Sequence, residues 1–217
     1  MGLSRKASGM LAASLIFGIL CGLIAAWLGV LYVPAERLRS TYQMRLAHKN
    51  FSVEVAKFAD ELELPYAYFM ALTVLECSGE KPCDTRFENH VYERLEQVRV
   101  GERERYGKVR QPHIHDATDD ALRNLATSWG PFQLMGYKCI DMSVHVADIR
   151  GKDAVRHGMR WISEEYGGVL REGSFKDAFH IHNAGRPYPK IGPPRTHDPR
   201  YVERGLRYMD YFASREP

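Results

Sequence analysis

The sequence predicts a mainly α-helical protein, in which one helical domain follows a single N-terminal membrane-spanning helix. A run without any charged side chain extends from Leu11 to Val33, and apolar residues recur at helical spacing through much of the chain after it. Glycine and proline interrupt the stretch from Ser128 to Gly136, where regular helix is therefore not expected. With 217 residues, 45% hydrophobic and 26% charged, the chain suits one globular domain with an appendage.

The charge-free run is long enough to span a bilayer. At about 1.5 Å per residue, residues 11–33 match a hydrocarbon core of about 30 Å, whereas a signal peptide usually has a shorter apolar region of about 7–15 residues. We therefore expect a short basic segment over residues 1–10, a transmembrane helix over 11–33, a basic stalk over 34–50 and one domain over 51–217. More basic residues follow the run than precede it, so positive charge alone favours a cytoplasmic C-terminal side.

The domain is predicted to begin with two helices. Phe51 and Ser52 have the pattern of a hydrophobic staple and an N-terminal cap, and the apolar stripe over residues 53–62 predicts a helix that packs on the core. Pro65 suits the first turn of a second helix. Residues 66–74 are apolar nearly all round, so this second helix is predicted to be buried.

Glu76 follows the buried segment and precedes Ser78 and Gly79. A glycine at this place can end the helix in a left-handed conformation. The carboxyl end of a helix and apolar neighbours both favour a protonated carboxyl group, which is what a general acid requires. The alternative interpretation is a glutamate that points into solvent beyond the end of the helix.

Three cysteines, Cys77, Cys83 and Cys139, follow the apolar run. An oxidised Cys77–Cys83 loop, a Cys83–Cys139 bridge and reduced, buried thiols are all compatible with the sequence. An odd number leaves at least one thiol unpaired within the chain.

Further helices are predicted over residues 87–98, 119–127, 137–146, 152–170, 174–182 and 198–212. Residues 99–117 show no apolar period, which predicts an exposed insertion. Its His113, His115 and Asp116 have no second cluster at metal-ligand spacing, so we expect no metal, and no motif calls for a cofactor. A net charge of +3 is too small to indicate nucleic-acid binding but suits an anionic polymer or a membrane surface.

The stretch from Ser128 to Gly136 combines two glycines and a proline with four large apolar side chains. This combination predicts a sharp turn whose side chains are buried or line a cleft. Two roles for Gln133 stay open: an amide paired inside a buried turn, or an amide in a cleft wall that faces a polar ligand.

Residues 126–136 resemble the SWG-FQ-MG block of peptidoglycan N-acetylmuramidases with a lysozyme-like fold, which are related to the lytic transglycosylases. Three more segments match in the same order along residues 53–213. Leu72–Gly79 resembles the helix end that carries the catalytic glutamate, Phe87–His90 resembles the F-E-x-H segment, and His182–Gly185 followed by Tyr188 resembles the Y-N-A-G block.

The resemblance implies a lysozyme-like fold and cleavage of the β-1,4 bond between N-acetylmuramic acid and N-acetylglucosamine, by hydrolysis or by transglycosylation. Glu76 would be the general acid. Hydrolysis needs a second carboxylate, for which Glu88 is the candidate, followed by Asp84 and Asp116. The resemblance also implies hydrogen bonds to the sugars from Ser128, Gln133 and Asn183, and packing on sugar faces by Phe132 and Tyr188.

Peptidoglycan as substrate favours a single-pass protein of the inner or cytoplasmic membrane with its domain on the outer, periplasmic side, because large domains translocate despite flanking charge. His182, where the family usually has tyrosine, and Pro131 depart from the family pattern. These departures keep a second hypothesis open, in which a membrane-tethered protein binds the wall or assists its assembly without turnover. The sequence names no protein partner.

Overall fold

The structure is a computed structural model that describes residues 35–217. Contacts divide the chain between Thr41 and Tyr42, and the packing and the pockets described below lie within Tyr42–Pro217. The predicted transmembrane helix over residues 11–33 and the basic segment before it lie outside the described residues. No helix between residues 35 and 217 has the length and apolar character needed to cross a bilayer.

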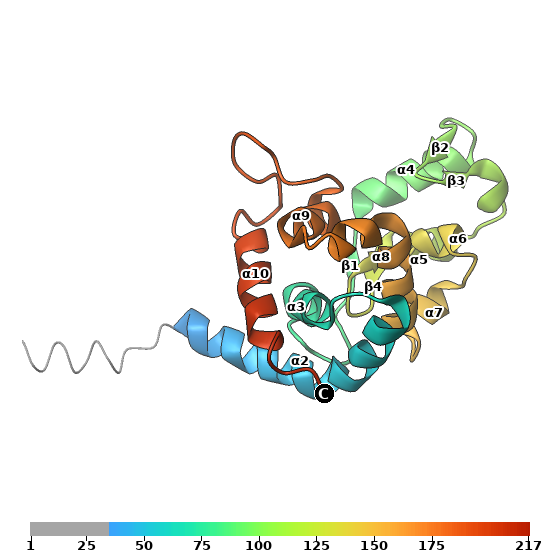
Figure 1. Cartoon of the computed structure of the whole chain (residues 1–217). Coiled ribbons are helices and arrows are strands. Elements are labelled where there is room, and N and C mark those ends of the chain that lie inside the picture. The colour runs from blue at the N-terminus through green and yellow to red at the C-terminus, as the bar shows by residue number, and fades with distance from the viewer. Residues whose placement is uncertain (1–34) are drawn as a thin grey trace, which may run out of the picture. The chain divides into compact units, whose positions relative to one another are not determined.

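The described part of the chain is mainly α-helical, as predicted (Figure 1). Within residues 35–217 the nine α-helices are α2 (Ala35–Leu62), α3 (Tyr66–Cys77), α4 (Asn89–Arg99), α5 (Asp119–Leu125), α6 (Lys138–Asp141), α7 (Val146–Arg150), α8 (Ala154–Arg171), α9 (Phe175–Ala184) and α10 (Tyr201–Phe212). The strands are β1 (Arg86–Phe87), β2 (Arg105–Tyr106), β3 (Val109–Arg110), β4 (Thr127–Trp129) and β5 (Leu134–Met135).

Helix α3 lies at the centre of the helical core. Ten of its 12 residues are buried, which confirms the burial predicted from its apolar sequence. Helix α10 packs along α3, and α9 covers a neighbouring side, where the rings of Tyr68 and Phe179 lie 4.6 Å apart. The end of α3 therefore emerges from a packed core, which fixes the position of any side chain in its last turn.

The central block of the sequence forms a small hairpin. Strand β4 pairs antiparallel with β5, with Ser128 opposite Met135, and β4 also pairs with β1. The sheet order is β1-β4-β5. Gly130 and Gln133, with φ of 73° and 48°, shape the turn between the strands. The sharp turn was predicted, but the short strands on either side of it were not.

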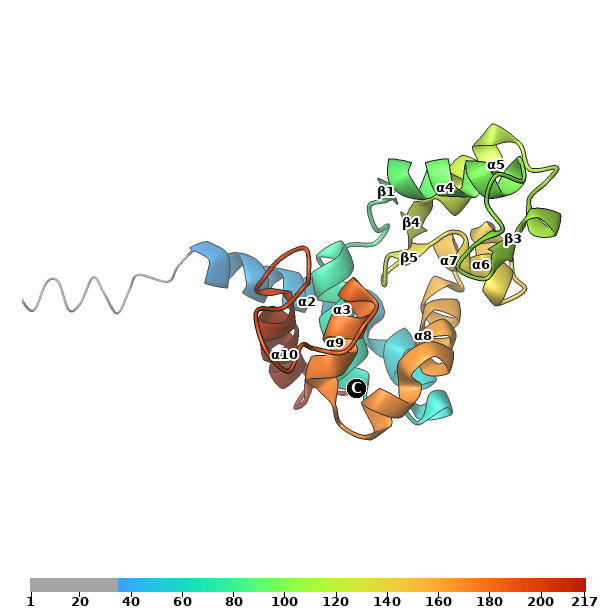
Figure 2. The same cartoon turned by 90° about the horizontal axis from the view of Figure 1, so that it is seen from above.

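Helices α4 and α5 lie with the small sheets at one side of the helical core (Figure 2). The insertion predicted over residues 99–117 contains the hairpin of β2 and β3 and the 3-10 helix η1 (Gln111–His113). Val109 and Ile114 from this segment are buried, so it is anchored and not wholly exposed. Two isolated apolar residues produce no period, so this anchoring could not be predicted from the sequence.

Helix α2 passes without a break through Phe51 and Ser52, so the cap predicted there is wrong. Both residues are buried. Residues 42–50, which were assigned to a basic stalk, belong to the same helix and bury Met44 and Ala47. The buried residues of α2 are spaced three or four apart from Met44 through Phe51 to Ala59, so the apolar stripe starts about two turns earlier than predicted.

Two left-handed residues end helix α3: Ser78, with φ 56°, and Gly79, with φ 73°. The Gly79 N–H donates to the Thr73 carbonyl over 2.9 Å, which closes the last turn. The glycine stop predicted after Glu76 is therefore confirmed. A Cβ on Gly79 would lie 2.5 Å from the backbone nitrogen of Ala47, so only glycine lets the end of α3 approach α2 this closely.

Candidate active site

A pocket of about 450 Å³ lies beside the end of α3, between the β4–β5 hairpin and the segment that joins α9 to α10. Five residues predicted for the site line it: Glu76, Glu88, Ser128, Gln133 and Asn183. The lining also includes residues that were not predicted: Leu75, Arg86, Met135, His197, Asp198, Tyr201 and Arg204. The structure thus brings together side chains that are more than a hundred residues apart in the sequence.

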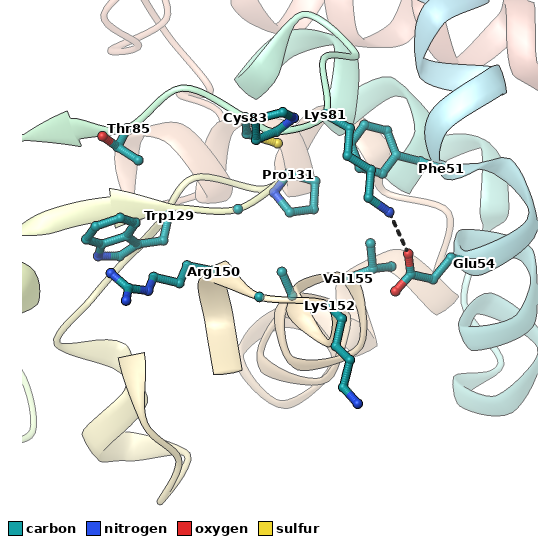
Figure 3. A pocket seen from close by; sticks show the side chains of 14 residues that line it. Phe51, Glu54, Lys81, Cys83, Thr85, Trp129, Pro131, Arg150, Lys152 and Val155 are labelled. Atoms are coloured by element: carbon teal, nitrogen blue, oxygen red, sulfur yellow. Dashed lines mark hydrogen bonds and ion pairs between the residues drawn. The ribbon is translucent and has the colours of Figure 1, made fainter. Parts of the chain in front are cut away.

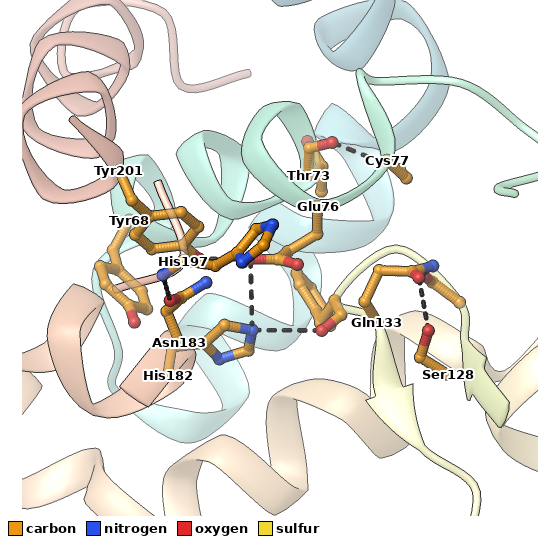
Figure 4. Close-up of polar contacts among 12 residues, drawn as sticks. Tyr68, Thr73, Glu76, Cys77, Ser128, Gln133, His182, Asn183, His197 and Tyr201 are labelled. Atoms are coloured by element: carbon orange, nitrogen blue, oxygen red, sulfur yellow. Dashed lines mark hydrogen bonds and ion pairs between the residues drawn. The ribbon is translucent and has the colours of Figure 1, made fainter. Parts of the chain in front are cut away.

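Glu76 projects from the last turn of α3 toward His182 on α9 (Figure 4). Its side chain is 16% exposed, and Nε2 of His182 lies 3.8 Å from Oε1 of Glu76. The Tyr201 hydroxyl donates a hydrogen bond to the same oxygen. Among residues 35–217, the polar contacts of this carboxyl group thus fall on Oε1, which leaves Oε2 for a ligand in the pocket.

His182 has a defined protonation state. Burial lowers the pKa of its imidazole, against the opposing effects of Glu76 and of the Phe132 carbonyl, so the ring is neutral near pH 7 and carries one N–H. Nε2 lies 3.1 Å from the Phe132 carbonyl, which can only accept, so Nε2 is the donor. Nδ1, 2.7 Å from the Tyr166 hydroxyl, must then accept the hydrogen of Tyr166.

A chain of buried hydroxyl groups extends this arrangement into the core. Because Tyr166 donates to His182, its oxygen accepts from Tyr68, 3.2 Å away. Burial raises the pKa values of Tyr68, Tyr166 and Tyr201, so all three phenols stay protonated and can donate. Tyr166 has a non-helical φ of −148° within α8, and this break lets its side chain contact both partners.

Glu88 occupies the N-cap position of α4. Its side chain is 23% exposed, and Oε1 lies 2.8 Å from Nε of Arg86. Oε2 lies 3.6 Å from Nδ1 of His90. Arginine is always charged, and the N-terminal end of a helix also attracts negative charge. Both oxygens of Glu88 therefore face cationic or polar partners.

Gln133 lines the pocket, but its amide is engaged within the hairpin. Its Oε1 accepts a 2.7 Å hydrogen bond from the Ser128 hydroxyl. Its Nε2 donates to the carbonyls of Asp84, at 2.8 Å, and Gly130, at 3.1 Å. Of the two roles left open by the sequence, the contacts favour the structural one, because the same groups cannot serve a sugar without breaking these bonds.

Asn183 and Asp198 form the opposite wall of the pocket. Asn183 Oδ1 accepts a hydrogen bond from the His197 backbone N–H at 3.1 Å, which leaves its NH₂ group for a ligand. Asp198 Oδ2 lies 2.6 Å from a guanidinium nitrogen of Arg204. This wall can therefore donate from Asn183, while the ion pair of Asp198 and Arg204 keeps it close to neutral.

Phe132 and Tyr188 do not line the pocket. Phe132 is 1% exposed, and its ring packs in the core against Phe69 at 5.7 Å, so the prediction that it stacks on a sugar is wrong. The Tyr188 ring lies 3.8 Å from Nζ of Lys176 and 5.4 Å from the His180 ring. Tyr188 thus packs on α9 and is not placed against a sugar in this pocket.

All three cysteines that the structure describes are free thiols. Cys77 and Cys83 both lie against the Glu80 carbonyl, at 3.6 and 3.4 Å. Their mutual hydrogen bond raises the pKa of Cys77, as burial also does, and lowers the pKa of Cys83, which Lys81 lowers further. Burial raises the pKa of Cys139 to about 11.

Between residues 35 and 217, no group of three or more His, Cys, Asp or Glu side chains is arranged to hold a metal ion. His113, which was considered as a ligand, instead accepts a hydrogen bond at Nδ1 from the Arg110 backbone N–H at 3.2 Å.

Comparisons of the chain with protein-family models, with curated proteins and with solved structures found no match.

Proposed function

We propose that this protein cleaves the β-1,4 bond between N-acetylmuramic acid and N-acetylglucosamine in peptidoglycan, with Glu76 as the general acid, in a domain of lysozyme-like type. The observation that carries the proposal is the setting of Glu76, whose Oε1 accepts from Tyr201 while Oε2 is left toward a polar pocket. The four ordered sequence blocks that resemble muramidases supply the substrate class.

The hydrogen bonds determine which oxygen carries the acidic proton. Oε1 accepts the hydrogen of Tyr201, so in the protonated acid the proton resides on Oε2. This proton passes to the glycosidic oxygen as the bond from that oxygen to C1 of the muramic acid breaks, with the bond electrons moving to the leaving oxygen. The Tyr201 hydroxyl then stabilises the carboxylate that remains.

The contacts of Glu88 favour transglycosylation for the second step. Hydrolysis uses a second carboxylate as base or nucleophile, yet both oxygens of Glu88 face Arg86 and His90. In the route that needs one carboxylate, the 6-hydroxyl of the muramic acid attacks C1, and Glu76 takes back the proton. The product then ends in anhydromuramic acid, and no water is consumed.

The pocket suits an uncharged sugar unit. Arg86 is paired with Glu88, and Arg204 with Asp198, so these four charges compensate one another. The NH₂ group of Asn183 can donate to an acetamido carbonyl.

The same proposal implies a cellular location. The charge-free run over residues 11–33 would anchor the chain in the inner or cytoplasmic membrane, with the domain on the periplasmic side, where peptidoglycan is found. Protease added to intact spheroplasts should then degrade the domain. A domain that becomes sensitive only after lysis would contradict this orientation.

The test is product analysis with the full-length chain, purified in detergent and incubated with isolated sacculi. We expect soluble muropeptides with anhydromuramic ends by mass spectrometry, and no release by Glu76→Gln. Reducing ends would show that water attacks and would restore Glu88 as the second catalytic carboxylate. Co-sedimentation with sacculi without any release would instead support a protein that binds the wall without turnover.

A further inference from the structure

A second and larger pocket, of about 570 Å³, lies apart from Glu76. It is lined by the loop before β1, the turn between β4 and β5, the junction of α7 with α8, and Phe51 and Glu54 of α2 (Figure 3). It shares no lining residue with the pocket of Glu76.

Strand geometry explains why the two pockets are separate. Trp129 lines the second pocket, while its neighbour Ser128 lines the pocket of Glu76. In the same way, Thr85 lines the second pocket and Arg86 lines the pocket of Glu76. Successive side chains of a strand point to opposite faces, so the hairpin and the chain leading into β1 form a wall with one pocket on each side.

The second pocket has an excess of positive charge. Its lining includes Lys81, Arg150 and Lys152 and a single carboxylate, Glu54. Glu54 forms an ion pair with Lys81, in which Nζ and Oε2 are 3.5 Å apart. No other carboxylate of the lining is then left to compensate the charges of Arg150 and Lys152. The guanidinium carbon of Arg150 lies 5.3 Å from the centre of the Trp129 ring. A guanidinium stacked in this way can still present N–H groups at its edge to a planar anion.

The rest of the lining is apolar. Phe51, Pro131, Ala154 and Val155 are buried residues that contribute to the wall, and the Trp129 ring adds a flat surface. A small inorganic anion would meet the cations but leave this surface uncovered. The pocket is therefore complementary to a molecule that carries an anionic group next to an apolar one.

We propose that this pocket binds the C-terminal end of a peptide, with the free carboxylate at Arg150 and the last apolar side chains against Trp129 and Pro131, while Lys152 adds positive charge at the edge of the pocket. A carboxylate is planar and matches the fork of a guanidinium. This inference is independent of the proposed function, because binding is measured without turnover.

The experiment is isothermal titration calorimetry of the full-length Glu76→Gln chain, purified in detergent, with acetyl-Leu-Phe as the free acid and as the C-terminal amide. We expect the acid to bind at least about tenfold more tightly than the amide, since charge-assisted hydrogen bonds are the stronger ones. Added salt should weaken binding of the acid.

Two substitutions and a control locate the binding. Arg150→Gln should weaken binding of the acid about tenfold, and Lys152→Gln should weaken it less, because its amine is directed away from Arg150. Both side chains are exposed, so the fold should be retained, as circular dichroism can verify. Arg156→Gln removes an exposed charge of α8 outside the pocket and should change nothing.

Four results would overturn the proposal, of which three concern the peptide. They are equal affinity for acid and amide, unchanged binding by both pocket variants, or no binding of the acid by the parent chain. Inorganic phosphate that binds as tightly as the peptide acid would show that the apolar surface plays no part, and would also overturn it.

Discussion

Glu76 and Glu88 line one pocket but stand at opposite ends of their helices. Glu76 lies in the last turn of α3, which is buried on nearly all sides, and its contacts come from a phenol and a neutral imidazole. Glu88 occupies the N-cap position of α4 at the side of the small sheet, and its nearest partner is the guanidinium of Arg86. The same residue type thus meets the negative end of one helix and the positive end of another.

The difference assigns the two carboxyl groups to different tasks. The Tyr201 hydroxyl donates to Oε1 of Glu76, and among residues 35–217 no polar contact falls on Oε2. Both oxygens of Glu88 instead face Arg86 and His90. Under the proposed function, the helix side of the pocket supplies the chemistry, and the side formed by the small sheet supplies the wall.

The largest expected effect comes from exchanging each carboxyl group for an amide. Glu76→Gln cannot donate a proton, and general acid catalysis contributes about 10²- to 10⁴-fold in rate, so release of muropeptides from sacculi should fall by at least that order. Glu88→Gln should keep activity within about tenfold of the parent chain, as for loss of one surface ion pair. Equal losses in the two variants would remove the distinction between the two sides of the pocket.

Tyr201→Phe probes the donor that holds Oε1 of Glu76. A hydrogen bond to a charged group contributes about 1.5–3 kcal/mol, so the rate of glycan cleavage should fall about 10- to 100-fold. Binding to sacculi in a pull-down assay should be retained. Tyr208→Phe, on the same helix but outside the pocket, is the matched control, and a loss of activity there as large as in Tyr201→Phe would point to a general effect on α10.

Gln133→Ala tests whether the Gln133 amide, on the side of the pocket formed by the small sheet, stabilises the fold and does not bind substrate. The variant removes three side-chain hydrogen bonds, with the Ser128 hydroxyl and with the carbonyls of Asp84 and Gly130, and leaves the Asp84 carbonyl without this donor. The free energy of unfolding should therefore fall by about 1–3 kcal/mol in urea titrations. Gln97→Ala removes one exposed contact with Arg103 and should cost less than about 0.5 kcal/mol. A Gln133→Ala chain that is as stable as the control but inactive would instead place the amide on the substrate.

The smallest effect concerns pH and His182. The folded state holds this ring neutral because burial lowers its pKa, whereas the unfolded chain binds a proton below about pH 6.5. Unfolding therefore takes up a proton, and the free energy of unfolding should decrease as the pH falls below about 6.5, by up to about 1.4 kcal/mol per pH unit. His182→Gln should lose this component of the slope in urea titrations between pH 7 and pH 5. His90→Gln, at the exposed partner of Glu88, is the control, and a slope unchanged in His182→Gln would mean that the ring is not held neutral.

Local sequence signals predicted the helix side of the pocket well. The apolar residues before Glu76 and the Ser78–Gly79 pair after it define where α3 is buried and where it ends, and both are confirmed. The small sheet beside the pocket was harder to predict, because a strand of two or three residues is too short to show an alternation of apolar and polar side chains. Phe132, which lies in the turn between the strands, was assigned to sugar contact by the family resemblance, although it packs in the core.

The partners of Glu76 are the part that sequence reasoning missed. Tyr201 was noted as a member of the last helical stripe, and His182 as a departure from a family pattern. Neither position indicates contact with residue 76, because that contact depends on how α9 and α10 pack against α3. The available signal was the excess of hydroxyl and imidazole groups on apolar helix faces, since such groups need partners when buried.

The close approach at Gly79 sets a rule for recognising relatives. The backbone of α2 occupies the space where a side chain at this position would be, so a chain that keeps this geometry needs glycine three residues after its acidic residue. It also needs a helix that presents a small residue where Ala47 stands. Ancestry would then be detectable as a pair of small residues 32 positions apart in this chain, even where the chemistry at residue 76 has been lost.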